Sequence, residues 1–256
     1  MAKIDLNCDL GEGFGRYTLG EDEAVMQVIT SANIACGLHA GDPLVMDQTV
    51  RLAARYGVSL GAHPGYPDLQ GFGRRVMDLT AEEAEAFTLY QVAALAGFAR
   101  AAGKELVHVK PHGALYNQAA RDARLAEAVA RGVARFSREL ILVGLAGSLL
   151  ISAGQAVGLR VASEGFPDRA TNLDGSLRSR REPGAVLDSL EAICAQAVRL
   201  AQEGLRIQEG DQVRFARVDT LCIHGDQPGA AHHAAAVRAA LIEQGIVLLP
   251  LPDVLD

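Results

Sequence analysis

The sequence is poor in aromatic residues and has no surplus of positive charge. Tryptophan is absent, and aromatic residues make up only 5% of the 256 residues. Proteins that stack single-stranded bases on aromatic platforms need more of them. Lys and Arg number 24 against 31 Asp and Glu, which gives a formal net charge of −7. Nucleic-acid binders usually carry a basic surplus, so we expect no nucleic-acid partner.

Several recognisable segments are also missing. No apolar run is long enough to span a membrane, so no membrane partner is expected. The first residues lack the apolar stretch of a secretory signal peptide. The four cysteines include no CxxC pair, which favours reduced thiols and a cytoplasmic location. The absence of a Walker A motif excludes a P-loop nucleotide site, and the absence of GxSxG argues against an α/β-hydrolase triad.

Short β-rich runs alternate with longer helical patterns along the chain. One helix is expected to begin at Asp42-Pro43, and another at Thr80, which forms a capping box with Glu83. The alternation predicts an α/β fold, a (β/α)7–8 TIM-like barrel in a single domain over residues 1–256, with an open doubly wound sheet as the alternative. Strands are expected at 3–8, 30–36, 58–63, 106–110, 140–145, 159–163, 218–224 and 246–249. Further helices are expected at 121–136, 147–157, 184–203 and 229–244.

Ionisable residues stand at the carboxyl ends of five expected strands. Side chains alternate between the two faces of a strand, and in each of these strands one face is apolar while the other ends in a charged or imidazole side chain. Barrel active sites form at this edge. A buried ion pair or a core histidine explains any one of these residues alone but not the whole set. The strand ends contribute Asp9, His63, Lys110, Glu164 and His224, and the following turns add Glu12, His39, Asp42, Asp68 and His112.

Four of these histidines are also possible metal ligands, because neutral imidazole binds zinc and similar ions. They are His39, His63, His112 and His224. No HxxxH or HExxH pattern occurs, so the sequence leaves open whether a metal is required; if one binds, Asp9, His39 and His63 are the first candidates. His108 is expected to fill an interior layer, and Cys222 to be a core cysteine.

Two connections are long for a βα unit, Pro64 to Asp78 and Gly165 to Pro183, and loops of this length usually bind ligands or act as lids. The second contains four arginines, so it is either an anion-binding loop or simply a solvated one. These arginines are Arg169, Arg178, Arg180 and Arg181.

Five motifs in this order resemble the LamB/YcsF (lactam-utilisation) family, which supplies the A subunit of the bacterial ATP-hydrolysing 5-oxoprolinase. They are Asp5 to Glu12, Ala32 to Gly37 with His39 to Asp42, Gly61 to Asp68, Gly71 to Arg74, and Lys110 to Asn117. The resemblance implies a barrel of the glycoside hydrolase/deacetylase type. It also implies partner subunits B and C and the opening of 5-oxo-L-proline to L-glutamate, with ATP, accompanied by Mg²⁺, as co-substrate of the complex.

The family reaction leads to hypotheses for individual residues. Asp9 or Asp42 would act as a base, His63 and His112 would carry protons, and Lys110 would stabilise an oxyanion or phosphate. The catalytic set is Asp9, His39, Asp42, His63, Lys110 and His112. The substrate-binding set is Asn7, Glu12, Asn33, Arg74, Tyr116, Glu164, Arg169 and His224, in which Arg74 or Arg169 would hold a carboxylate.

Two other functions remain open from the sequence. The same residues suit a metal-dependent amide hydrolase or deacetylase that acts on an N-acyl substrate without ATP. The barrel could also bind the substrate or dock the other subunits while the chemistry occurs elsewhere.

Overall fold

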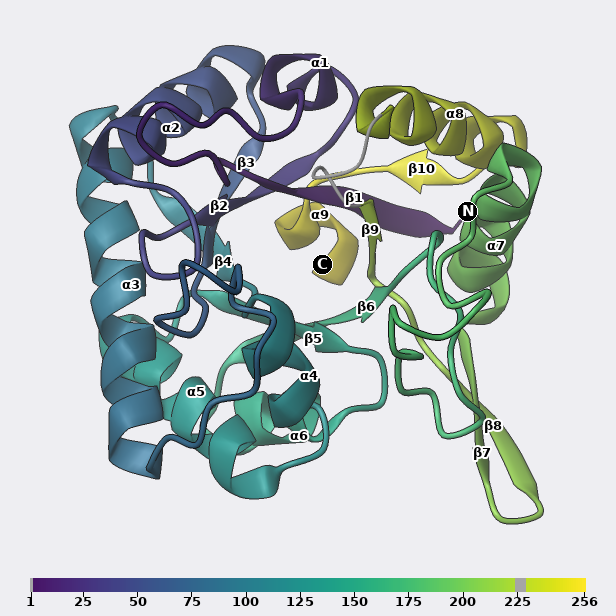
Figure 1. The fold of residues 1–256 in the computed structure, drawn as a ribbon. Helices are drawn as coiled ribbons and strands as arrows, with labels where there is room; N and C mark the ends of the chain where they lie inside the picture. Colours follow the sequence, from purple (N-terminus) through teal and green to yellow (C-terminus); the bar gives the residue numbers. More distant parts are fainter. Residues whose placement is uncertain (1, 224–228) are drawn as a thin grey trace.

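Seven parallel strands close into a barrel (Figure 1). The computed structural model describes residues 2–223 and 229–256. The barrel runs in the order β1, β2, β3, β4, β5, β6 and β9, and it closes where Asp5 to Cys8 of β1 pair with Thr220 to Ile223 of β9. The closed barrel is therefore confirmed over the open sheet. Its strands are β1 (Lys3–Leu10), β2 (Ser31–Ala35), β3 (Ser59–His63), β4 (Leu106–Val109), β5 (Ile141–Leu145), β6 (Arg160–Gly165) and β9 (Thr220–Ile223).

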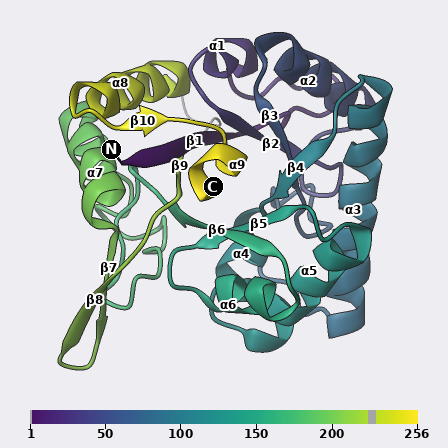
Figure 2. The same cartoon turned by 180° about the vertical axis from the view of Figure 1, so that it is seen from behind.

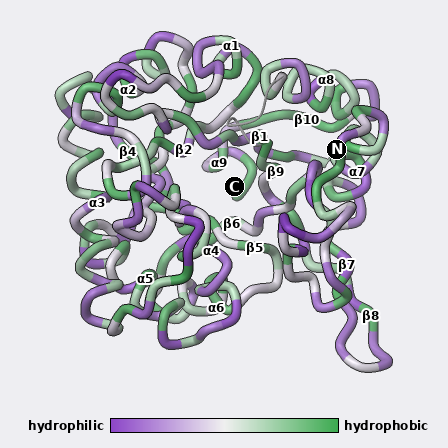
Figure 3. The backbone as a smooth tube through the Cα atoms, viewed as in Figure 1, coloured by the Kyte–Doolittle hydropathy of each residue, from purple (hydrophilic) through white to green (hydrophobic). Residues whose placement is uncertain are grey.

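The outer helices begin where local sequence rules predict. Asp42 caps α2 by accepting hydrogen bonds from Leu44 N and Val45 N, with Pro43 at the first helical position. Thr80 and Glu83 form the predicted capping box of α3. Green and purple alternate along helices such as α3 in Figure 3, as expected for one face on the barrel and one in water. The helices are α1 (Asp22–Met26), α2 (Pro43–Tyr56), α3 (Ala81–Ala101), α4 (Gly113–Ala119), α5 (Ala123–Phe136), α6 (Leu149–Ala156), α7 (Leu190–Glu203), α8 (Ala230–Glu243) and α9 (Leu251–Leu255).

The amino-terminal end of the barrel is covered by the last residues of the chain. The short strand β10 (Val247–Leu248) pairs with Lys3 and Ile4 of β1, and α9 follows it. Leu251 of α9 packs against Ile141 and Val143 of β5 inside the ring, and both views place α9 at the centre of the strands (Figure 2). This apolar plug closes the amino-terminal end of the barrel.

Some elements were not predicted. The sequence from 205 to 216 folds into a projecting hairpin of β7 (Leu205–Glu209) and β8 (Gln212–Ala216), which pair in antiparallel fashion. The turn residues Gly210-Asp211 between alternating side chains were the available signal. No bounds were predicted for helices α1, α4 and α9; each has at most seven residues, which is too short for a clear helical period. The helix expected from 184 begins at Leu190.

Alternation within the strands sets what lines the barrel. Ile4, Leu6 and Cys8 of β1 face outward into the main hydrophobic core, whereas Asp5, Asn7 and Asp9 face inward and hydrogen-bond with polar residues of neighbouring strands. Within the part of the chain that the structure describes, no helix is both long and apolar enough to cross a membrane.

Candidate active site

A buried lysine links three strands at the carboxyl end of the barrel. Lys110 Nζ, just after β4, lies 2.9 Å from Asp9 Oδ1 of β1 and 2.9 Å from Glu164 Oε1 of β6. Burial by itself lowers the pKa of Lys110, but attraction by the neighbouring carboxylates and by the Cys222 thiol outweighs it and raises the pKa well above its usual value. The side chain is therefore a fixed ammonium, held at the place where the sequence predicted a catalytic cation.

Amides beneath the lysine hold the carboxylates in place. Asn33 Nδ2 donates to Asp9 Oδ1 at 2.9 Å and to Asn7 Oδ1 at 2.7 Å. Asn7 Nδ2 in turn donates to Glu164 Oε1 at 3.0 Å. Asn7, Asn33 and Glu164, which the sequence placed in the substrate-binding set, thus surround the charged centre. In the structure their hydrogen bonds are made to protein atoms.

His108 lies one layer deeper. Its Nε2 is 2.8 Å from Asn33 Oδ1, and burial lowers its pKa to about 3. The ring occupies the space above Gly61, where an added Cβ would meet Nε2 at 2.0 Å. The expectation that His108 fills an interior layer is confirmed.

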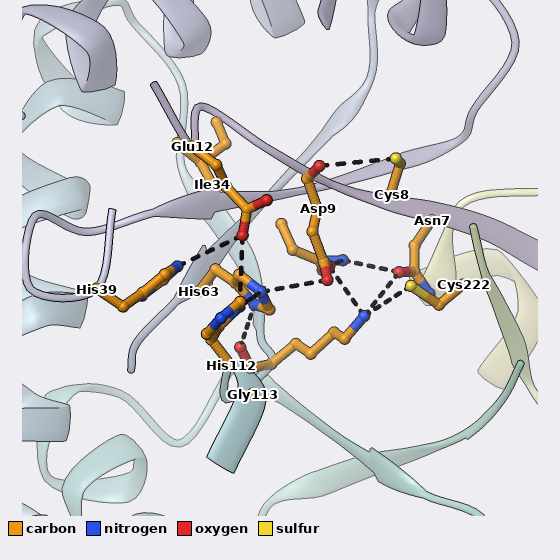
Figure 4. A network of polar contacts seen from close by, with 12 residues as sticks. Asn7, Cys8, Asp9, Glu12, Ile34, His39, His63, His112, Gly113 and Cys222 are labelled. Atoms are coloured by element: carbon orange, nitrogen blue, oxygen red, sulfur yellow. Dashed lines mark hydrogen bonds and ion pairs between the residues drawn. The ribbon is translucent and has the colours of Figure 1, made fainter. Parts of the chain in front are cut away.

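Three histidines and one glutamate gather on the other side of Asp9 (Figure 4). One ligand atom from each of Glu12, His39, His63 and His112 lies within 4.8 Å of the others, and all four residues are buried. His39 and His112 are stacked with ring centroids 3.8 Å apart. His63 Nε2 is 3.3 Å from Asp9 Oδ2, so Asp9 joins this cluster to Lys110.

Close backbone packing fixes the imidazoles. A Cβ on Gly65 would lie 2.5 Å from His39 Nδ1, and one on Gly73 would lie 2.7 Å from His39 Cβ. Burial, followed by the neighbouring histidines, lowers the pKa of His39 and of His112 well below the usual value, so both rings are neutral near pH 7.

The long loop after β3 holds this packing in place. Phe72 has a positive φ of 55°, which is unusual for a residue with a side chain. Its carbonyl oxygen accepts a hydrogen bond from His112 Nε2 at 2.9 Å. Asp68 binds the Gly71 N–H and the Arg75 guanidinium and thereby closes the turn. Phe72 was not among the predicted site residues; the glycines on either side of it were the available signal.

The other predicted residues lie around this centre in different roles. Asp42 has both carboxylate oxygens engaged by backbone N–H groups, from Leu44 and Val45 on one side and Gly15 on the other. Asp42 therefore caps helix α2 and holds the loop after β1 through Gly15. It lies outside the groups around Lys110 and the three histidines. His224 lies outside the described residues.

Positive charge and aromatic rings form the rim. Arg74 lies over the Phe72 ring, 4.8 Å from its centroid. Arg169 is buried and donates to the carbonyl oxygens of Ala185 and Arg178, and burial, then Arg180, lowers its pKa to about 10. Arg169 therefore anchors the long loop after β6 and adds charge near the mouth.

Two further side chains complete the centre. The Tyr116 ring packs edge-on against Phe166, and burial beside Glu164 raises the pKa of its hydroxyl well above the usual value. Cys222 is buried as expected, but its Sγ also lies 2.9 Å from Lys110 Nζ. The alternation in β9 placed Cys222 on the inward face, which was the signal for this contact.

The chain is similar to known proteins over almost its whole length. The sequence model of the LamB/YcsF family matches residues 4–256. A Pyrococcus furiosus protein named as the A subunit of 5-oxoprolinase is 53% identical over 252 residues, 98% of each chain. A Chloroflexus aggregans protein of the same name is 54% identical over 249 residues, 97% of this chain and 98% of that protein.

Two solved structures are also similar to the chain. The crystal structure of a lactam utilization protein from Thermus thermophilus superposes with a TM-score of 0.88 at 44% identity, covering 96% of this chain and 99% of that one. A mutant CE4 family pseudoenzyme shares the fold alone, with a TM-score of 0.50 at 8% identity over 100% of this chain and 68% of that one. From the matched length and identity, the chain belongs to the LamB/YcsF family.

Proposed function

We propose that this chain is the A subunit of an ATP-dependent 5-oxoprolinase, which opens the lactam of 5-oxo-L-proline to L-glutamate with hydrolysis of ATP to ADP and phosphate. The observation that carries the proposal is identity of 52–54% over nearly the full length of relatives named as 5-oxoprolinase A subunits. In this proposal a single barrel domain over residues 1–256 carries the site, and subunits B and C complete a cytoplasmic enzyme.

The chemistry of the substrate explains why ATP is needed. A five-membered lactam is an unstrained, resonance-stabilised amide that water attacks poorly. Phosphorylation of its carbonyl oxygen makes the ring carbon a better electrophile. The chain has no P-loop motif, so the proposal leaves ATP, with Mg²⁺, as a co-substrate of the whole complex rather than a ligand of this one chain.

Lys110 and Asp9 suit the ring-opening step. The Lys110 ammonium is buried, so its charge acts in a medium of low dielectric and can stabilise an oxyanion or a phosphoryl oxygen strongly. Asp9 is 9% exposed and lies between Lys110 and His63. We assign Asp9 as the base that takes the proton from the attacking water, and Lys110 as the oxyanion-stabilising group.

The rim suits an acidic substrate. 5-Oxoproline carries a carboxylate, and a guanidinium recognises carboxylates through paired hydrogen bonds. Arg74 lies at the mouth beside the histidines, whose pKa values its charge lowers. Arg169 uses its Nε and one terminal nitrogen to hold backbone carbonyls. We therefore assign the substrate carboxylate to Arg74 and a supporting charge to Arg169.

A coupled assay for glutamate release tests the proposal. The chain is mixed with its B and C subunits and 5-oxoproline, with and without ATP. Glutamate should form only with all three subunits and ATP, and Asp9→Asn should reduce kcat by about 100-fold or more, the usual contribution of a general base. Asp253→Asn, the same change on α9 at the opposite end of the barrel, is the control and should be fully active. No glutamate from folded, associated subunits would refute the substrate assignment.

A second candidate reaction is ATP-independent hydrolysis of an N-acyl substrate. It is favoured by the group of Glu12 with three histidines, which has the composition of a metal-assisted hydrolase site. Chelator-sensitive release of acetate from N-acetylated substrates by the chain alone, without ATP, would support it. Absence of such activity in metal-supplemented protein would exclude it.

A further inference from the structure

Two ring nitrogens face each other at hydrogen-bond distance in the histidine group. His63 Nδ1 is 2.7 Å from the carbonyl oxygen of Lys110, and His112 Nε2 is 2.9 Å from that of Phe72. A carbonyl oxygen only accepts, so both of these nitrogens carry hydrogen. Whenever these two rings are neutral, their lone pairs are therefore on His63 Nε2 and His112 Nδ1, which lie 2.9 Å apart. Two lone pairs at this distance repel unless a cation lies beside them.

Glu12 and His39 place further possible metal-ligand atoms beside these two nitrogens. Glu12 Oε1 is 3.4 Å from His112 Nδ1 and 3.5 Å from His39 Nε2. Neither ring nitrogen of His39 has a hydrogen-bond partner among residues 2–223 and 229–256, although the ring is fully buried. A buried polar atom without a partner is costly, and a ligand that accepts its lone pair removes that cost.

From this geometry we infer that Glu12, His39, His63 and His112 bind one divalent transition-metal ion. Zinc bonds to nitrogen and oxygen at about 2.0–2.2 Å, so ligands at the corners of a tetrahedron lie about 3.3 Å apart. The separations of 3.4 and 3.5 Å from Glu12 Oε1 match this edge, and the 2.9 Å between the two imidazoles is somewhat shorter. All four ligand atoms lie within 4.8 Å of one another, so the longer separations must shorten for one ion to reach all of them.

The surroundings resemble those of known metal ligands. Metal-binding histidines almost always donate their second ring N–H to a carbonyl or carboxylate, as His63 and His112 do. Three imidazoles and one carboxylate favour zinc or a neighbouring transition metal over magnesium, which prefers oxygen ligands. The metal ligands expected from the sequence were Asp9, His39 and His63. The inferred site instead combines Glu12 and His112 with the two histidines. Asp9 lies at the edge of this site, with its carboxylate 3.3 Å from His63 Nε2.

The site goes beyond the proposed lactam reaction and does not depend on it. When bound, an ion of this kind supplies a Lewis acid that polarises a carbonyl or a water molecule. Lys110 and the four metal-binding residues lie on opposite sides of Asp9.

Metal binding by the full chain tests the inference without any turnover assay. Protein treated with a chelator and then dialysed is titrated with Zn²⁺ against a chromophoric chelator, and separately with Co²⁺ while visible absorption is recorded. We expect one equivalent of tightly bound Zn²⁺ and the absorption bands of Co²⁺ with nitrogen and oxygen ligands. Removing a residue that only hydrogen-bonds to a metal ligand lowers metal affinity by roughly 10–100-fold. Removing a direct ligand, as in His39→Gln or Glu12→Gln, should therefore weaken Zn²⁺ binding by about 100-fold or more.

A matched control separates this site from surface histidines. His232 and His233 lie on α8, and the double variant His232→Gln/His233→Gln should bind Zn²⁺ as tightly as the unmodified chain. Glu12→Gln keeps the shape of its side chain, and circular dichroism checks that it folds. The inference is overturned if the unmodified chain binds no Zn²⁺, as expected if His63 and His112 only share a proton. It is equally overturned if folded Glu12→Gln and His39→Gln bind as tightly as the control. Either outcome leaves the glutamate assay to judge the lactam reaction separately.

Discussion

Lys110→Met removes the buried cation that lies between two carboxylates, and the distances to them set the expected loss of stability. Asp9 and Glu164 each have an oxygen 2.9 Å from Lys110 Nζ, and side chains at this centre are almost fully buried. At an effective dielectric constant of about 20, two like charges about 5 Å apart repel by about 3 kcal/mol. Breaking a buried ion pair by removing one partner typically costs about 3–5 kcal/mol. We therefore expect the free energy of unfolding to fall by about 3–5 kcal/mol.

Urea unfolding followed by circular dichroism measures this change. In the Lys110→Met background, Glu164→Gln should recover about 1–3 kcal/mol, because it removes one of the two uncompensated charges. Lys104→Met, the same change at an exposed lysine before β4, should shift the free energy by no more than about 0.5 kcal/mol. If Lys110→Met is as stable as Lys104→Met, or if Glu164→Gln recovers nothing, the reasoning about this charge network is wrong.

Three further predictions concern the barrel interior and one helix cap. Burial raises the pKa of Asp5 from 3.8 to about 6, so the unmodified chain is most stabilised by this group below pH 4 and loses that stability as pH rises through 6. The free energy of urea unfolding of Asp5→Asn, relative to that of the unmodified chain, should therefore rise by on the order of 3 kcal/mol between pH 4 and pH 8. A difference between the two proteins that stays the same across this pH range would contradict this. Gly61→Ala should lower the free energy of unfolding by about 1–3 kcal/mol or more, because its methyl group would enter the His108 ring. Gly97→Ala, at an exposed position of α3 with open space around it, should raise the free energy of unfolding by up to about 1 kcal/mol. Equal melting temperatures of the two variants would contradict the packing argument. Thr80→Ala should cost about 1 kcal/mol through loss of the capping box, and Thr80→Ser should retain most of it; hydrogen exchange at the first turn of α3 reports the difference.

Local rules account for what could be predicted about the fold. Every expected strand is present within a few residues, because the period-two alternation of apolar and polar side chains is strong in β1 and β9. Asp42 and Thr80 mark helix starts through contacts within three residues along the chain. The hairpin of β7 and β8 was missed because its strands are short and β8 is almost wholly exposed, so only Leu205 and Ile207 of β7 carry a buried apolar pattern.

The position of the candidate site follows from the ends of the parallel strands. Parallel strands bring their carboxyl ends to one edge, and this alone brings Asp9, Lys110 and Glu164 together. Asp42 also follows a strand and is also an aspartate, yet it caps helix α2. A carboxylate that binds backbone N–H groups and one that faces a lysine look alike in sequence.

The repeating strand and helix units, the polar inward face of the strands and the edge at which ionisable residues collect can all be derived from local patterns in the sequence. These follow from side-chain alternation and from capping, which act over a few residues. The contacts between individual site residues follow from the folded arrangement of the chain. Closure of β1 onto β9 places Cys222 against Lys110, and the turn at Phe72 sets the ring orientation of His112 and brings it to Glu12. These pairings join residues far apart in the chain, so they depend on strand register and loop packing, which no local pattern specifies.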